Sequence, residues 1–386
     1  MFNRIKRIGG PAAALVCIVL AAGCPAAPGK GGTREPIPDL KREIFVLNSL
    51  AETVSIINPD AVRDPDGLIA ADDHIEYGAA VDLEKKPIYN DVFLVGKWPN
   101  HILHYDGKLY ITSSGENIVE VYDETSFAWI GRIDLGTNSN PWMTVRKEGT
   151  SKGYVVNFAA GDVAVVDLDT REVLERIPAG SGPEGAAYLN GRLFICNTNW
   201  NQQEYGFDTG TVTVIDTVND EVEETIELGE TETNPQSVLA LPDQDEIHVV
   251  CTGKNGGDDS NDGVIVVVDA DPGSPGFLTI TGRYSVGGSP VYSEGGLDSA
   301  RGRAYLSGVG GITAYDYTTG AVEPVLTADD QENDLFAGTI YDESSDIIFA
   351  ADFTHDRVLA LDGSTYEVLA EIRGSDGVQS PVLTTE

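Results

Sequence analysis

Basic residues are scarce in this sequence of 386 residues, which has 25 Lys and Arg against 62 Asp and Glu and a formal net charge of −37 at pH 7. Proteins bind phosphate backbones by neutralising them with Lys and Arg, so we do not expect nucleic acid as a partner. An acidic field favours cationic ligands and metal ions instead. The same charge also keeps the surface of an exported protein soluble.

Cysteine is also scarce, and two of the four residues, Cys17 and Cys24, lie in the N-terminal segment. The other two, Cys196 and Cys251, are too far apart in sequence for a C-x-x-C zinc motif or a haem-attaching C-x-x-C-H. We also expect no nucleophile elbow of the G-x-S-x-G type. The five histidines show no metal-ligand spacing: His74, His101, His104, His248 and His355. These absences favour a binding protein over an enzyme, with no certain cofactor.

The first 24 residues have the three parts of a secretory signal peptide: Arg4, Lys6 and Arg7, then an apolar stretch over residues 11–20, then small residues before Cys24. The apolar stretch is too short to span a bilayer, which takes about 20 apolar residues. The sequence Leu-Ala-Ala-Gly-Cys24 resembles the lipobox of bacterial lipoproteins. That resemblance implies that Cys24 becomes the lipidated first residue. The alternative is an ordinary signal peptide cut nearby, with Cys24 a spare thiol.

The lipoprotein interpretation divides the chain into a signal peptide (1–23), a lipidated tether (24–40) and a folded body (41–386). The tether is rich in Pro, Ala and Gly, which is typical of a flexible linker. The lipid would attach the protein to a membrane of the cell envelope. Pro25 stands where many Gram-negative lipoproteins kept at the inner membrane have Asp, so we expect the outer membrane or the cell surface.

A four-residue pattern, apolar residues closing on a small or polar one, recurs seven times in the body. The copies are Phe45-Val-Leu-Asn48, Tyr110-Ile-Thr-Ser113, Tyr154-Val-Val-Asn157, Phe194-Ile-Cys-Asn197, Val249-Val-Cys-Thr252, Tyr305-Leu-Ser-Gly308 and Phe349-Ala-Ala-Asp352. Each copy predicts a buried strand, followed by a second strand that usually ends on Asp. A more polar third strand then leads, often through Gly and Pro, to a short strand that begins the next copy. Four strands with a period of about 40–45 residues are typical of a propeller blade.

The two ends of the body complement each other. The first copy begins at Glu43 without a Pro-led strand, and residues 379–385 supply such a strand with no further strands after it. We therefore predict an all-β fold, a seven-bladed β-propeller closed by the C-terminal strand pairing into the N-terminal blade, which leaves no exposed sheet edge. A sandwich or an open solenoid explains neither the seven copies in phase nor the shared blade.

The segments Tyr110-Ile-Thr-Ser113, Tyr154-Val-Val-Asn157 and 211–216 resemble the repeat of the YVTN-repeat (YncE-like) β-propellers, a family of periplasmic and surface proteins. The resemblance covers nearly all of residues 43–386. It implies the architecture but says little about function, because the repeat residues mostly fill blades.

Cys196 and Cys251 fall at the same place in two successive copies of the pattern. An oxidising compartment permits a disulfide, but that bond needs Cα atoms about 4.4–6.8 Å apart. We expect neighbouring blades to hold the two residues farther apart than this. The prediction is therefore two buried, unpaired thiols.

The face of a propeller that holds the central mouth also holds two sets of connections: those from the outer strand to the next inner strand, and those from the second to the third strand. Aromatic, amide and ionisable residues in or beside these connections are candidates for binding. They are His101, Trp142, Glu184, Trp200, Tyr205, Gln236 and Tyr292. Such a rim resembles surfaces that hold glycans or peptides by stacking and hydrogen bonding. We expect a monomer whose partner is a small molecule, a glycan or an envelope protein.

These candidates differ in how much the fold alone explains them. Trp200 and Tyr205 lie in a long connection, residues 197–210, that a blade does not need. For Trp142 and Tyr292 the alternative is a packing role between blades. Another long insertion, residues 59–90, joins the third and fourth strands of the first blade on the opposite face.

The connection over residues 252–263 contains Asp258-Asp-Ser260-Asn-Asp262-Gly263. Alternating oxygen donors before a turn glycine are typical of a calcium loop, because spacing by two places three oxygens inside a tight turn. Asp258, Ser260 and Asp262 are therefore candidate calcium ligands. An acidic turn with glycine also occurs without metal, so both interpretations stay open.

The sequence thus favours an envelope-anchored, non-catalytic propeller that acts as a binding or scaffold protein at its mouth. The alternative is a lactonase-like or lyase-like enzyme with acid-base or metal residues there. Glu184, His101 and His355 are its candidates, since a carboxylate and an imidazole suffice for acid-base chemistry.

Overall fold

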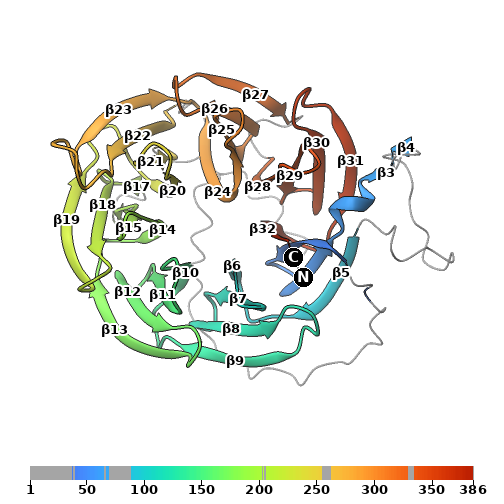
Figure 1. The fold of residues 1–386 in the computed structure, drawn as a ribbon, viewed down its shortest axis with the longest axis horizontal. Coiled ribbons are helices and arrows are strands. Elements are labelled where there is room, and N and C mark those ends of the chain that lie inside the picture. The colour runs from blue at the N-terminus through green and yellow to red at the C-terminus, as the bar shows by residue number, and fades with distance from the viewer. Residues whose placement is uncertain are drawn as a thin grey trace.

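A computed structural model describes Ile37 and residues 40–64, 67–68, 88–201, 203, 206–253, 262–328 and 334–385. For residues 63, 64, 67, 68, 292, 294 and 385 it describes the backbone alone. Seven antiparallel four-stranded sheets surround a central axis as the blades of a propeller (Figure 1). No helix in the described part of the chain is long and apolar enough to cross a membrane.

The blades follow one another along the chain, with the inner strand of each named first. They are β32 (Val378–Thr385), β1 (Arg42–Asn48), β2 (Thr53–Ile57) and β5 (Ile88–Leu94) in blade one; β6 (Pro99–Tyr105), β7 (Lys108–Ser113), β8 (Ile118–Asp123) and β9 (Trp129–Asp134) in blade two; β10 (Pro141–Arg146), β11 (Lys152–Asn157), β12 (Asp162–Asp167) and β13 (Glu172–Pro178) in blade three; β14 (Pro183–Leu189), β15 (Arg192–Asn197), β18 (Thr211–Asp216) and β19 (Glu221–Glu227) in blade four; β20 (Pro235–Leu241), β21 (Glu246–Cys251), β22 (Val264–Asp269) and β23 (Ile280–Ser285) in blade five; β24 (Ser289–Asp298), β25 (Arg303–Val309), β26 (Gly311–Asp316) and β27 (Val322–Thr327) in blade six; and β28 (Phe336–Asp342), β29 (Ile347–Asp352), β30 (Arg357–Asp362) and β31 (Val368–Arg373) in blade seven.

The C-terminal strand closes the ring, as the sequence predicted. β32, red in Figure 1, lies beside blue β1 and pairs antiparallel to it, with Val378 opposite Asn48 and Val382 opposite Phe45. It also contacts the inner strands β6 and β28 of the two adjoining blades. Arg42 of β1 also forms an ion pair with the buried Asp342 of blade seven at 2.6 Å. Side chains therefore reinforce the closure that backbone pairing makes.

The core consists of seven apolar clusters among the described residues, and each lies between two neighbouring blades. The second and third strands are buried along almost their whole length, whereas outer strands such as β13 and β19 are mostly exposed. A strand buried on both faces reads as a continuous apolar run. This is why the second strand of each blade carries the most recognisable pattern in the sequence.

The Asp at the end of the third strand shapes the turn to the outer strand. In blade four, Asp216 Oδ1 accepts the backbone N–H of Val218 at 2.8 Å, and Asp220 follows with a positive φ of 56°. The N–H of Asp220 donates to the carbonyl of Asp216 at 2.8 Å. Asp167, Asp316 and Asp362 accept the backbone N–H two residues on in the same way. The recurrent Asp is thus explained by turn geometry.

The position of the pattern in blade five was predicted one residue too late. Pro235 pairs with Cys251 as Pro183 pairs with Asn197, so the copy in blade five is His248-Val-Val-Cys251. Cys251 therefore corresponds to Asn197, not to Cys196. Both thiols are buried and free, as expected. The imidazole of His248 takes the buried aromatic position and hydrogen-bonds the Tyr315 hydroxyl at 3.0 Å.

The insertion in blade one begins with a short 3-10 helix, η2 (Pro59–Ala61), and a small ribbon of β3 (Arg63–Asp64) and β4 (Gly67–Leu68). It joins the third and fourth strands of the blade, as predicted. Its other residues lie outside the described part of the chain.

Candidate functional site at the mouth face

Backbone hydrogen bonds tie the two sets of mouth-face connections together. Thr198 N donates to Gly182 O at 3.0 Å in blade four, and Thr252 N donates to Asn234 O at 2.9 Å in blade five. Gly182 and Asn234 both have positive φ, of 61° and 54°. Glycine and Asn tolerate that region most easily, which explains why they recur before the proline that starts an inner strand.

The inner strands bulge immediately after their first residues. The register shifts between Pro141 and Met143, and again between Pro183 and Ala186 and between Pro235 and Ser237. A bulge turns a side chain away from the regular alternation. Trp142, Glu184 and Gln236 all lie at these bulges. Two further bulge residues act across blades, because Gln379 Nε2 donates to Pro99 O at 2.6 Å and Asn100 Nδ2 donates to Pro141 O at 3.2 Å.

Glu184 is buried between blades four and five, with 1% of its surface exposed. Neither carboxyl oxygen makes a hydrogen bond of standard geometry among the described residues. Burial raises the pKa of Glu184 to about 8, although the nearby amide of Gln236 works in the opposite direction. A Cβ on the adjoining Gly185 would collide with the carbonyl oxygen of Gln236, so the two inner strands touch here. Glu184 therefore lies in a junction between blades, where burial favours its protonated form.

Gln236 faces this junction with its oxygen already in use. Its Oε1 accepts a hydrogen bond from Thr252 Oγ1 at 2.9 Å, and the same hydroxyl approaches Pro290 O at 3.0 Å. This leaves the amide nitrogen of Gln236 as the group that faces the Glu184 carboxyl as a donor. Thr252 thus links blades five and six, a role that its place in the sequence pattern did not indicate.

Trp142 is partly buried and packs against the cluster between blades three and four. Its ring lies 6.1 Å from that of Phe158, in the turn after β11. These contacts favour the alternative in which Trp142 packs between blades and does not bind a ligand. Tyr292 belongs to β24, but its side chain lies outside the description.

The candidate acid-base residues belong to three different blades. His101 is on β6 of blade two, opposite Thr112, and is half-buried. His355 Nδ1 lies 3.0 Å from Asp352 Oδ2, and its Nε2 lies 3.7 Å from Asp334 Oδ1. Arg357 binds the same Asp352 at 2.8 Å. The carboxylates around His355 thus come from blade seven and the connection before it, whereas Glu184 is enclosed by blade five.

The long connection of blade four forms a small hairpin, β16 (Trp200–Asn201) with β17 (Gly206–Phe207). The rings of Trp200 and Phe207 meet edge to face, with centroids 5.0 Å apart. Asn199 Nδ2 donates to Thr209 O at 2.6 Å, and Thr209 bridges to Thr233 in the next connection. Tyr205 lies outside the described residues. What is described is an aromatic hairpin fixed to the mouth face.

Of the three candidate calcium ligands, only Asp262 lies within the described residues. Its carboxylate lies against the backbone of Gly253, where a Cβ would collide with Oδ1. No group of three or more potential His, Cys, Asp or Glu ligands gathers in the described part of the chain. That finding does not cover Asp258 or Ser260, so calcium binding stays a prediction.

The sequence does contain one G-x-S-x-G match, contrary to our prediction. Gly149-Thr150-Ser151-Lys152-Gly153 has the letters G-x-S-x-G. The segment forms the turn from β10 to β11 and the start of β11 in blade three. A nucleophile elbow joins a strand to a helix, and the Ser151 hydroxyl instead donates to Asp167 Oδ2 at 3.4 Å. The match therefore has the wrong structural context for a nucleophile.

The fold is similar to that of solved structures. A chain of Kuenenia stuttgartiensis hydrazine synthase matches with a TM-score of 0.59 and 15% identity, covering 72% of this chain and 87% of that chain. The computationally designed Ika8 protein matches with a TM-score of 0.49 and 11% identity, covering 72% and 75% of the two chains. No family model and no curated protein matches the sequence. The similarity to the hydrazine synthase chain supports the fold alone, a seven-bladed β-propeller.

Proposed function

We propose that this protein is an exported, lipid-anchored, non-catalytic propeller of the YVTN-repeat (YncE-like) type, which binds a glycan, a small molecule or an envelope protein at its mouth face. The observation that carries the binding role is the β16–β17 hairpin of blade four. Most second-to-third-strand connections of the ring are short turns, whereas this one adds a strand pair and an aromatic contact.

The hairpin suits recognition because it is held in place before any ligand arrives. Asn199 fixes its base through Thr209, and Asn201 Nδ2 donates to Asp208 Oδ2 at 3.2 Å across it. A fixed aromatic surface loses little conformational entropy on binding, and its rings stack on sugars or peptide groups. Trp200 is partly exposed and is the residue we expect to contact the ligand.

Binding is tested by thermal unfolding in the presence of soluble peptidoglycan fragments and neutral and cationic oligosaccharides. A ligand that binds the folded state must raise the melting temperature. Trp200→Ala should abolish that rise. Trp129→Ala is the matched control, because Trp129 is 58% exposed on the outer strand β9. A rise that survives in Trp200→Ala would refute the hairpin as the binding surface.

The proposed anchor rests on Cys24 and the signal-like residues before it. Cys24→Ser should prevent lipidation and move the exported protein from the outer-membrane fraction to the soluble fraction. Labelling with a radioactive fatty acid checks the modification itself. Export without labelling of the natural protein would support the ordinary signal peptide instead.

The enzyme alternative has one observation in its favour, the buried Glu184 with a pKa of about 8. A carboxyl that is protonated at neutral pH suits a general acid. It must reach a substrate, however, and Glu184 is enclosed between blades. Lactone hydrolysis by the natural protein but not by Glu184→Gln would favour this alternative.

A further inference from the structure

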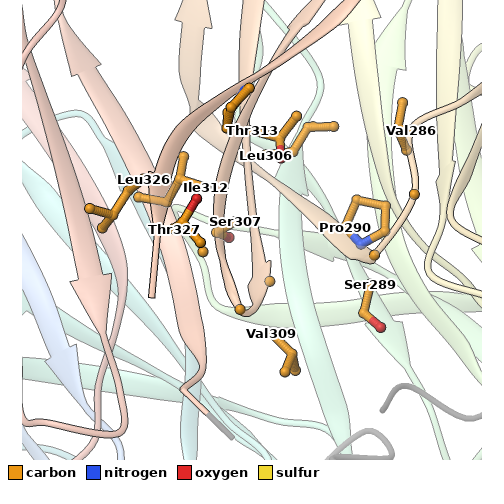
Figure 2. Close-up of a pocket in the computed structure, with 16 residues that line it drawn as sticks. Val286, Ser289, Pro290, Leu306, Ser307, Val309, Ile312, Thr313, Leu326 and Thr327 are labelled. Carbon is orange, nitrogen blue, oxygen red and sulfur yellow. The ribbon is translucent and has the colours of Figure 1, made fainter. Parts of the chain in front are cut away.

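Blade six contains a cavity of about 210 Å³ around the end of its β25–β26 hairpin, and Val286 and Leu306 line the part that faces blade five. Figure 2 shows Val286 and Pro290 on one side of the β25–β26 hairpin and Leu326 and Thr327 on the other. The lining comes from all four strands of the blade and from the connection that leads into β24. It shares no residue with the hairpin of blade four, so it is a separate site from the proposed binding surface.

Three other blades fill the corresponding place with a buried Asn side chain. In blade four, Asn197 pairs with Pro183 and is fully buried. Its Nδ2 donates to the hydroxyls of Thr211 at 3.1 Å and Thr213 at 3.0 Å, and its Oδ1 accepts the N–H of Gly180 at 2.9 Å. Asn48 and Asn157 are the buried equivalents in blades one and three.

Blade six lacks this amide. Gly308 pairs with Pro290 and so stands where blade four has Asn197, which pairs with Pro183. Gly311 pairs with Gly308 and so stands where blade four has Thr211. A Cβ on Gly308 would collide with the carbonyl oxygen of Ser289, and a Cβ on Gly311 with that of Leu326. The chain therefore cannot supply the missing group from these positions without moving its backbone. Thr313, which corresponds to Thr213, keeps its hydroxyl at the cavity.

The lining has a definite chemical character. Its side chains are apolar or carry hydroxyl groups, and none is charged. Exposed Pro324 and Thr327 lie at its outer edge, where a ligand can enter. A cavity of about 150 Å³ holds a benzene molecule, so this one has room for a six-membered ring with one polar substituent. The acidic protein, with a net charge of −37, disfavours an anion there.

We propose that blade six binds a small uncharged molecule that carries a carboxamide on a ring-sized apolar body. The amide takes the place that Asn197 occupies in blade four and donates a hydrogen bond to Thr313 Oγ1. The ring lies against the apolar side chains of Val286, Pro290 and Leu306.

The test uses benzamide as the probe, with benzoate and toluene as the charged and the apolar comparison, and measures binding by calorimetry and ligand-observed NMR. Benzamide should bind better than either. Thr313→Val should weaken its binding about tenfold, the usual effect of losing one neutral hydrogen bond, and Thr313→Ser should restore it. Val286→Phe should abolish binding by filling the space, whereas Val322→Phe, on the outer strand β27 and outside the lining, should not.

Three results would overturn the proposal. They are equal binding of toluene, undiminished binding to Thr313→Val, and no binding of benzamide at about 10 mM, which is weak for a ligand of this size in a formed cavity. If Val286→Phe fails to fold, the Thr313→Val and Thr313→Ser pair still decides. Loss of Trp200 should leave benzamide binding unchanged, which separates this site from the β16–β17 hairpin of blade four.

Discussion

Blades four and six share one plan of four strands but differ at the residue that closes the second strand. In blade four, Asn197 joins its own third strand to the connection from blade three through three hydrogen bonds. In blade six the same place is Gly308, and a cavity lies beside it. The comparison shows that the polar residue of the repeat acts as a connector inside the blade.

Breaking the connector of blade four should have the largest effect. Asn197→Ala leaves the two Thr hydroxyls and the Gly180 N–H without the amide, and three neutral hydrogen bonds at about 1 kcal/mol each predict a loss of about 3 kcal/mol in the free energy of unfolding. Urea unfolding measures it. The matched change in blade six, Thr313→Val, should cost less than about 0.5 kcal/mol, because a surface or cavity-facing hydroxyl has no such network. Equal losses in the two blades would remove the distinction between them.

Glu184 offers the next test, at the junction of blades four and five. Burial raises its pKa to about 8, above the value of about 4.3 expected in an unfolded chain. Its contribution is therefore fully present below about pH 4.3 and is lost as the pH rises through 8. Glu184→Gln should leave stability unchanged near pH 4 and increase it by about 2 kcal/mol near pH 6, because each pH unit above the unfolded pKa costs the folded state about 1.36 kcal/mol until the pH reaches the folded pKa.

The measurement is the difference in unfolding free energy between the natural protein and Glu184→Gln at a series of pH values. A difference that does not change between pH 4 and pH 8 would mean that the Glu184 carboxyl is not the titrating group. Glu232→Gln is a comparison at the same two blades, since Glu232 is buried but has Arg283 as a partner at 3.0 Å.

The sequence predicted the fold well because the fold depends on many repeated signals. Seven copies of one pattern and a proline-led strand at the C-terminus sufficed to predict the number of blades and the closure. The register of blade five was wrong by one residue. Thr252 looks like the polar residue that closes the pattern, and only the pairing of Pro235 with Cys251 shows that it does not.

The site was less predictable because it depends on contacts between blades. Glu184 is enclosed because Gln236 of the next blade approaches it. No local sequence pattern indicates that approach. The cavity of blade six depends on Ser289 lying against Gly308. The glycines are visible in the sequence, but the collision that keeps a side chain out is not.

The calcium prediction extends the comparison to blade five, whose long connection also departs from the common plan. If Asp258, Ser260 and Asp262 hold calcium, a concentration ten times the dissociation constant should stabilise the fold by about 1.4 kcal/mol. The melting temperature should rise with calcium and fall with EDTA, and Asp258→Asn should remove the response. A melting temperature that changes with neither calcium nor EDTA would contradict the metal site.

The smallest effect concerns a feature that blades four and six have in common, the Asp turn after the third strand. The backbone N–H of Val218 lowers the pKa of Asp216, against a smaller effect of burial. Because the pKa of Asp216 is lower in the folded chain, the turn stabilises the fold above about pH 3.9, the pKa of Asp in an unfolded chain. This contribution is lost as the pH falls through the pKa of Asp216 in the folded chain. Asp216→Asn should therefore cost about 1 kcal/mol or less at pH 7, as expected for one turn hydrogen bond, and nothing near pH 2. Asp316→Asn in blade six should behave alike, because Asp316 accepts the Thr318 N–H at 2.9 Å in the same geometry. Unequal results in the two blades, measured by urea unfolding at both pH values, would mean that blade six departs from the common plan at its outer turn as well as at Gly308.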